Sequence, residues 1–271
     1  MNRPVLSSLI LYDIAPNIAA FSTERHTEES DLPYAGFNVT PYTGDLPSHV
    51  ASCHEQLASS LHISPSRIII PHQVHGTRIA IVDEQLLTYP DDRLEGVDAV
   101  VSNLTEVCLG VSTADCVPLL FYDPKQEVIG AAHAGWRGTV ARIGVLTLAQ
   151  MYESFGSSPQ DVLCLIGPSI GPEAFEVRED VYDSFRLAGF PMDEIATAVE
   201  QYEHFVPPRW RINLWKANAW QLQCAGLPAR NISITGICTY TDYARFFSAR
   251  RLGIQSGRIY TGILRRGNKN Y

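Results

Sequence analysis

The stretch STADCVPLLFYDPKQEVIGAAHAGWRG, residues 112–138, decides the fold of this chain. Its segments Val117–Asp123 and Val128–Gly135 are short and apolar, and Pro124 and Lys125 supply a turn between them. We therefore predict a buried β-hairpin, followed by a helix that begins after Gly138. Small residues flank the histidine of the second strand, and they would let the backbone approach a ligand closely.

Two side chains that bind transition metals lie near the ends of the predicted hairpin strands. These are Cys116 and His133, and pairing of the strands would bring them together. His75, in the bend PHQVHG that interrupts two β-rich runs, is the best candidate for a third ligand. Cysteine and histidine ligands suit zinc, and three protein ligands would leave the open fourth position that a catalytic zinc ion requires.

Other interpretations of these residues remain open at this point. Cys116 can instead be a nucleophile with His133 as its base, oriented by Asp115 or Gln73. The histidines can equally be structural and Cys116 a core thiol. Asp115 is a candidate general acid or base, or a support for its neighbour, and its structural alternative is a turn residue.

A candidate anion site follows His133. The sequence GWRG, Gly135–Gly138, precedes the predicted helix, so backbone N–H groups and Arg137 could hold a phosphate or carboxylate there. The pair Arg250–Arg251 invites the same interpretation. The structural alternatives are a surface arginine beside a packed Trp136, and a solvated arginine pair.

The remaining pattern alternates strands and helices, with several hairpins, and indicates one mixed α/β domain rather than a doubly wound parallel sheet. A helix is predicted after Asp45, with Asp45 and Ser48 as candidate caps. Strands are predicted over Val5–Asp13, Asn17–Thr23, two runs in Arg67–Asp83, the region near Val100, Val107–Ser112, 161–167 and 231–238. The other predictions are helices over Thr139–Gly156, 179–190 and Asn213–Gly226, a loop over 168–177, irregular structure around 190–210, and strand-like segments over 245–251 and 257–264.

Composition narrows the classes of function. A net charge of −8 argues against nucleic acid or an anionic membrane as the main partner, although a local basic pocket for phosphate is compatible with it. The N-terminal run favours a first strand over a signal peptide, and no apolar stretch approaches the length of a membrane span. The six cysteines are dispersed without a CxxC pair, which indicates free thiols and a cytoplasmic location.

Three motifs in order carry a resemblance to a known family. QVHG (Gln73–Gly76), ADCVP (Ala114–Pro118) and HAGWRG (His133–Gly138) resemble the YfiH family, also labelled laccase-domain or polyphenol oxidase proteins. The resemblance implies an α+β fold, a single domain over residues 1–271 with packed mixed β-sheets flanked by helices, distantly like cysteine-hydrolase toxins. It also implies one zinc ion, with copper less expected, held by His75, Cys116 and His133.

The resemblance further implies purine nucleoside chemistry. The expected reactions are phosphorolysis of adenosine, inosine, guanosine or methylthioadenosine, and deamination of adenosine at the same site, so the partners would be a purine nucleoside and phosphate. The candidate catalytic residues are Asp115, Cys116 and Arg137, and the candidate substrate contacts are Asn38, Gln73, Arg137 and Arg250.

Alternatives within the resemblance are an amide or peptide hydrolase that edits peptidoglycan precursors and a non-catalytic zinc-binding protein. A laccase is not expected, because one mononuclear site lacks the several copper centres that four-electron oxygen reduction needs. The chain also departs from the family pattern, since Cys53–His54 stands where an Asn-Arg pair is often found.

Overall fold

The computed structural model describes residues 9–27, 29, 31–88, 93–199 and 208–267, and its centre is the predicted hairpin. The strands β7 (Val117–Asp123) and β8 (Val128–Ala134) pair antiparallel, and every residue of both is buried. They form the middle of a six-stranded sheet in the order β13-β9-β7-β8-β5-β4. The outer strands are β4 (Ile79–Ile81), β5 (Ala99–Ser102), β9 (Leu163–Ile166) and β13 (Ile232–Ile234).

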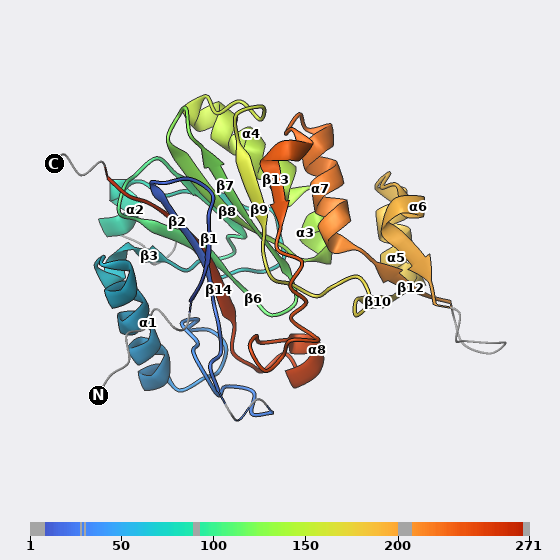
Figure 1. The fold of residues 1–271 in the computed structure, drawn as a ribbon, viewed down its shortest axis with the longest axis horizontal. Helices are drawn as coiled ribbons and strands as arrows, with labels where there is room; N and C mark the ends of the chain where they lie inside the picture. The colour runs from blue at the N-terminus through green and yellow to red at the C-terminus, as the bar shows by residue number, and fades with distance from the viewer. Residues whose placement is uncertain (1–8, 28, 30, 89–92, 200–207, 268–271) are drawn as a thin grey trace.

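A second sheet packs face to face on the first (Figure 1). Its order is β1-β2-β14-β6-β3. Leu109 and Ile263 from this sheet share a core cluster with Leu120 and Ile129 from the first, so the main interface between the layers is apolar. The strands are β1 (Leu9–Tyr12), β2 (Ile18–Thr23), β3 (Ile68–Ile69), β6 (Cys108–Thr113) and β14 (Ile259–Arg265).

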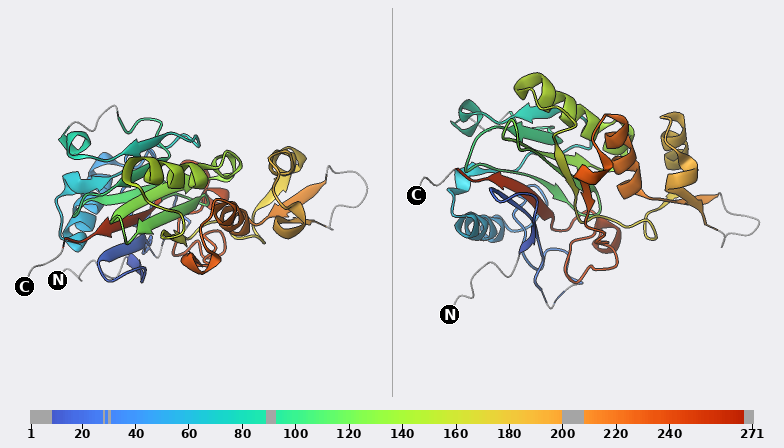
Figure 2. Two further views of the ribbon diagram at one scale, coloured as in Figure 1. Left: turned by 90° about the horizontal axis from the view of Figure 1, so that it is seen from above. Right: turned by 45° about the horizontal axis from the view of Figure 1, so that its top comes forward.

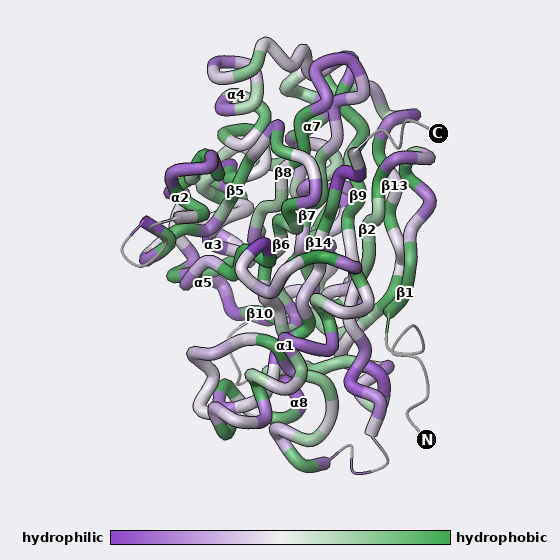
Figure 3. The backbone as a smooth tube through the Cα atoms, turned by 90° about the vertical axis from the view of Figure 1, so that its left-hand side faces the viewer, coloured by the Kyte–Doolittle hydropathy of each residue, from purple (hydrophilic) through white to green (hydrophobic). Residues whose placement is uncertain are grey.

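Helices cover the outer faces of both sheets (Figures 1 and 2). α4 (Ile143–Phe155) and α7 (Leu214–Cys224) bury apolar side chains against the six-stranded sheet, and the short α3 (Trp136–Val140) lies beside them. α1 (Pro47–Leu61) covers the five-stranded sheet. The hydropathy-coloured tube shows hydrophobic runs along the central strands (Figure 3). The α+β prediction of packed mixed sheets flanked by helices is therefore confirmed.

A small outlying layer extends from one end of the molecule (Figure 2). It contains the sheet β10-β12-β11 and two helices. The elements are β10 (Glu176–Arg178), α5 (Glu179–Leu187), α6 (Met192–Ile195), β11 (Ala196–Ala198) and β12 (Arg209–Ile212). The remaining short helices are α2 (Glu84–Thr88), α8 (Ala249–Leu252) and the 3-10 turns Pro65–Arg67 and Ala229–Asn231.

Two helix predictions were wrong in detail. The single helix predicted over Thr139–Gly156 is two helices, because Arg142 takes a left-handed φ of 66° that an α-helix does not contain. The first of them begins at Trp136, before Gly138. The predicted caps of α1 were also wrong, since its N-cap is Leu46 with Pro47 in the first turn and no side-chain cap. The carboxylate of Asp45 instead accepts from the Leu46 N–H and from Asn38.

Short strands and turns account for the other corrections. The loop predicted over 168–177 ends in β10, and the irregular region around 190–210 contains α6, β11 and part of a three-stranded sheet. These strands are too short for a periodicity to identify them. The strand-like segment predicted over 245–251 is a turn followed by α8, and Phe246 and Phe247 are buried in a separate small cluster.

At the N-terminus, β1 begins at Leu9, and residues 5–8 of the predicted first strand lie outside the described residues. The extent of the domain over 1–271 stays a prediction. Among the described helices, none combines the length and apolar character that a membrane crossing requires.

Candidate metal centre and its cavity

The three predicted ligands converge in the structure. Cys116 directly precedes β7, His133 is the penultimate residue of β8, and His75 lies in the bend before β4. Their ligand atoms all lie within 4.8 Å of one another, and Cys116 Sγ is 3.8 Å from His75 Nε2. His133 is buried, Cys116 is partly exposed and His75 is exposed, so the group opens to solvent on one side.

The arrangement fits one zinc ion. With bonds of about 2.3 Å to sulfur and about 2.1 Å to nitrogen, a tetrahedral site separates two such ligand atoms by about 3.6 Å, close to the distance between Cys116 and His75. The backbone also leaves space for the group, because a Cβ on Gly135 would lie 2.9 Å from Cys116 Sγ and 3.1 Å from His75 Cδ2. Glycine at this position is therefore what allows the ligands to approach one another.

A buried carboxylate supports the group. Asp98 directly precedes β5 and is fully buried, and its Oδ1 lies 2.8 Å from His133 Nδ1. This contact leaves Nε2 of His133 for the centre of the group. No role was predicted for Asp98 from the sequence. The only sign in the sequence that Asp98 is buried is its position between the apolar residues Val97 and Ala99.

The buried charges stabilise one another. Burial opposes ionisation of Cys116, but the positive charge of His133 and hydrogen bonds from both histidines lower the pKa of the thiol to about 6. Burial likewise disfavours the charged form of His133, while the Cys116 thiolate and Asp98 raise its pKa to about 9. Burial alone would raise the pKa of Asp98, but the contacts with His133 and with backbone N–H groups outweigh burial, so the pKa of Asp98 is lowered overall. Near neutral pH the metal-free group is thus a thiolate beside an imidazolium.

The group lies in the wall of a cavity of about 680 Å³. Apolar side chains form part of the lining, including Trp136, Ile170 and Phe175. The cavity brings together seven of the eight residues proposed from the sequence as ligands, catalytic groups or substrate contacts, and only Asn38 lies outside it. The seven that line the wall are Gln73, His75, Asp115, Cys116, His133, Arg137 and Arg250.

Three cationic side chains are among the residues that line this cavity. Arg137 and Arg250 were predicted from the sequence, and Arg258 is a further lining residue to which the sequence analysis assigned no role. The Arg137 guanidinium lies over the ring of Trp136, 4.4 Å from its centroid. Asp115 is the one carboxylate among the described lining residues, so three guanidinium groups outnumber it despite the negative charge of the whole chain.

The carboxylate of Asp115 is occupied by two donors. Its Oδ1 accepts from the Thr239 hydroxyl at 2.7 Å, and its Oδ2 accepts from the Arg250 N–H at 2.7 Å. Asp115 itself has a φ of 84°. Because Asp115 accepts from the Arg250 N–H, it fixes the start of α8, the helix that carries Arg250 into the cavity wall.

Gln73 has an equivalent anchoring role in the bend. Its amide nitrogen donates to the Ser112 carbonyl at 2.8 Å, and its oxygen accepts from the Ser112 N–H at 2.7 Å. Both ends of the side chain are thereby bonded to the end of β6. The contact fixes the bend that carries His75 against the second sheet.

Asn38 does not line the cavity. It is fully buried, its amide nitrogen donates to Thr43 and Asp45, and its oxygen accepts from the backbone N–H of Arg258 at 3.2 Å. Asn38 thus supports a lining arginine from behind. Cys53 is also buried, on the face of α1 that packs in the core cluster with the five-stranded sheet, and neither Cys53 nor His54 is among the residues that line the cavity.

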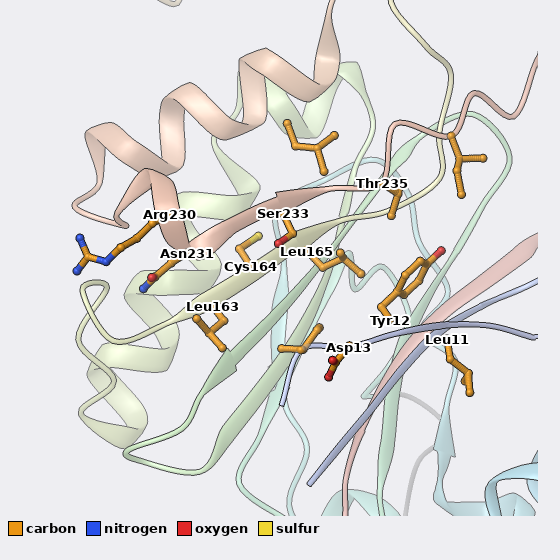
Figure 4. Close-up of a pocket in the computed structure, with 13 residues that line it drawn as sticks. Leu11, Tyr12, Asp13, Leu163, Cys164, Leu165, Arg230, Asn231, Ser233 and Thr235 are labelled. Carbon is orange, nitrogen blue, oxygen red and sulfur yellow. The ribbon is translucent and has the colours of Figure 1, made fainter. Parts of the chain in front are cut away.

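A second cavity, of about 440 Å³, lies between β1 and β13 (Figure 4). Figure 4 shows Tyr12 and Asp13 on one side and Ser233 and Thr235 on the other. No histidine is among its described lining residues, and burial raises the pKa of its Cys164 thiol. Its lining offers no ligand set comparable with that of the first cavity.

Fold and site together define an α+β protein with a candidate mononuclear Cys/His metal centre in a cationic cavity. The chain belongs to the YfiH family, whose model, described as "Multi-copper polyphenol oxidoreductase laccase", matches residues 19–266. Among the residues that the structure describes, His75, Cys116 and His133 are the one group found in which three or more such ligands lie close together.

Named relatives cover nearly the whole chain. A protein of Bacteroides thetaiotaomicron named purine nucleoside phosphorylase is 42% identical over 92% of each chain. A protein from an unknown prokaryotic organism named adenosine deaminase RL5 is 36% identical over 92% of this chain and 94% of its own. Two crystal structures are also similar. YlmD from Geobacillus stearothermophilus is 31% identical in sequence, with a TM-score of 0.83 over 94% of each chain. The hypothetical protein YfiH of Bacillus licheniformis is 27% identical in sequence, with a TM-score of 0.87 over 98% of each chain.

Proposed function

We propose that this protein is a cytoplasmic zinc-dependent enzyme of purine nucleosides. The reactions are phosphorolysis of adenosine, inosine, guanosine and methylthioadenosine, and deamination of adenosine in the same cavity. The observation that carries the proposal is one cavity that combines a Cys/His ligand group, an apolar wall and three arginines. Relatives named for both activities support it.

The metal centre would be held by His75 Nε2, Cys116 Sγ and His133 Nε2. Lewis-acid polarisation of an oxygen is the chemistry that zinc supplies when bound in such a site. Three protein ligands among the described residues favour an open coordination position over the closed, four-ligand site of a structural zinc protein. One such group, found in the part of the chain that the structure describes, also falls short of the several centres that a laccase requires.

The other lining residues would each contact a different part of the substrate. Trp136 and Phe175 offer aromatic faces against which a purine can stack. Arg137 and Arg250 supply forked donors for the oxygens of phosphate, which a guanidinium binds in bidentate fashion. Asp115 is the candidate for proton transfer to or from the substrate, although its two present hydrogen bonds also make it an anchor.

The direct test is incubation of the purified, zinc-analysed protein with adenosine, with and without phosphate. Phosphate-dependent release of adenine and ribose 1-phosphate and phosphate-independent release of inosine are expected. Zinc-loaded protein that yields none of the three products contradicts the proposal.

Two adjacent arginines give a matched pair of variants for the phosphate contact. Arg250 lines the cavity, whereas the guanidinium of Arg251 lies over the rings of Tyr240 and Tyr243. Arg250→Gln should raise the KM for phosphate at least about tenfold, the size of one lost charge-assisted contact. Arg251→Gln should leave it unchanged. Equal effects of the two substitutions would remove Arg250 from the phosphate site.

A second candidate is an amide or peptide hydrolase acting on cell-wall precursors with Cys116 as nucleophile. The line of contacts from Cys116 to His133 to Asp98 favours it, since a cysteine nucleophile needs a base that a third group orients. Cys116→Ser separates the two roles. Loss of zinc together with activity supports the ligand role, and loss of activity with zinc retained supports the nucleophile.

A further inference from the structure

Asp98 forms hydrogen bonds with both histidines of the candidate metal centre, through its carboxylate and its backbone carbonyl. Besides His133 Nδ1, its Oδ1 accepts from the His75 N–H at 2.9 Å. Its Oδ2 accepts from the Gly76 N–H at 2.7 Å and from the Val74 N–H at 3.2 Å. Its backbone carbonyl accepts from the His133 N–H at 2.8 Å.

The three N–H groups belong to consecutive residues and converge on one carboxylate. Such a concave arrangement of successive backbone N–H groups binds anions. His75 lies in its middle with a left-handed φ of 62°, a conformation that is costly for a residue other than glycine. The bonds to Asp98 offset that cost, so the carboxylate holds the bend in the shape that points His75 at Cys116.

The contact with His133 acts on the second ligand in a different way. A carboxylate accepts and does not donate, so it requires the proton on Nδ1 and leaves the lone pair of Nε2 for a metal. The same oxygen, Oδ1, serves the His75 N–H and the His133 ring. One atom therefore links the backbone position of one ligand to the tautomer of the other.

We propose that Asp98 is the positioning residue that makes the metal centre, by fixing His75 and His133 together in their ligating geometry. The inference concerns metal binding by this chain and does not require the nucleoside activity. It assigns to Asp98 no contact with substrate. Failure of either proposal therefore leaves the other standing.

The test compares Asp98→Asn with Asp123→Asn. Asp123 is also fully buried, and its Oδ1 also accepts backbone N–H groups, from Lys125 and Gln126, but it touches no candidate ligand. Purified metal-free variants are titrated with zinc against a competing chelator, and with Co²⁺ to follow the thiolate-to-cobalt absorption. Thermal unfolding of the metal-free proteins measures the general cost of losing a buried carboxylate.

Asp98→Asn is expected to weaken zinc binding by about 10- to 100-fold, as loss of a partner behind a ligating histidine does. Asp123→Asn should bind zinc like the parent protein even where it lowers thermal stability as much. In the NMR spectrum, the Nδ1 proton of the His133 ring should give a hydrogen-bonded, slowly exchanging signal in the parent and in Asp123→Asn, and that signal should be lost in Asp98→Asn. Zinc affinity of Asp98→Asn equal to that of Asp123→Asn overturns the proposal.

A gentler variant covers the case in which Asp98→Asn does not fold. A Cβ on Gly76 would lie 3.3 Å from Asp98 Oδ2, so Gly76→Ala presses on the same contact while keeping every polar group. It should weaken zinc binding in the same direction by a smaller factor. An unchanged zinc affinity and an unchanged His133 ring signal in Gly76→Ala count against Asp98 as the positioning residue.

Discussion

The substitution Gly135→Ala tests the geometry of the metal centre with a single added methyl group. Gly135 is the N-cap of α3 with φ −59° and ψ 169°, values that alanine adopts without strain. Any effect of the change is therefore steric. The new Cβ would lie 2.9 Å from Cys116 Sγ and 3.1 Å from His75 Cδ2.

These distances set the expected magnitude. Carbon atoms in contact prefer about 3.5–4.0 Å, so at least one ligand must move by about half an ångström. Metal–ligand distances tolerate only about 0.2 Å, and forcing an extra methyl group into a packed site costs about 1–3 kcal/mol. If the cost falls on the zinc-bound state, affinity drops by about 5- to 150-fold, since about 1.4 kcal/mol corresponds to a factor of ten.

Gly144→Ala provides the matched control. Its Cβ would meet Leu119 Cδ1 at 2.9 Å, the same crowding, but inside the apolar core under α4. Zinc affinity, measured by competition with a chelator, should fall in Gly135→Ala and stay at the parent value in Gly144→Ala. Parent affinity in Gly135→Ala would refute the reasoning that glycine is there to admit the ligands.

Three further predictions follow from the charges and contacts of the site. Zinc uptake at about pH 7.5 should release about one proton, because this pH lies between the pKa of Cys116, about 6, and that of His133, about 9. The Cys116 thiolate is then already formed, while His133 still carries the proton that zinc must displace. Calorimetry in buffers of different ionisation enthalpy measures the number of protons, and release of two would mean a neutral thiol. Asp115→Asn should raise the substrate KM several-fold with zinc content retained, since Thr239 and Arg250 donate to different oxygens of Asp115 and an amide keeps only one of the two. A loss confined to kcat, with one limb of the pH profile gone, would instead show proton transfer. Removal of zinc by a chelator should abolish activity. It should also lower the free energy of unfolding by about 3 kcal/mol, compared with protein in zinc at about a hundred times its Kd. An unchanged melting temperature would contradict metal binding to the folded state.

The central hairpin and the convergence of the three candidate ligands could be predicted from the sequence because their signals are local. β7 and β8 are continuous apolar runs around a turn, and the ligand residue types identify themselves once strand ends are paired. His75 was a candidate from its residue type alone, and the family resemblance supported it where no spacing rule connects it to the hairpin. The outlying sheet could not be predicted, because its three- and four-residue strands are too short for an alternating pattern to identify them.

The supporting residues were harder to identify, for a physical reason. Asp98, Arg258 and Asn38 act through contacts with segments distant in sequence, such as the bond between Asn38 and the Arg258 N–H. A sequence presents such a residue only as a polar side chain near apolar ones. Its partners are defined by the register of two sheets that pack together, and that register is a property of the whole fold.

The same reasoning explains why residues chosen from the sequence as chemical groups also have structural partners. Asp115 fixes Arg250, Gln73 fixes the bend that carries His75, and Asn38 fixes Arg258. Each of them joins a separate segment to the sheets that hold Cys116 and His133. A cavity whose walls come from such distant segments needs buried polar anchors, because loops without them would leave their backbone groups unpaired. The roles of ligand and anchor are therefore carried by different residues. Variants of Asp115 and Asn38 should change substrate affinity before they change metal content, whereas variants of Asp98 and Gln73 should change metal content because these two residues hold the bend that carries His75.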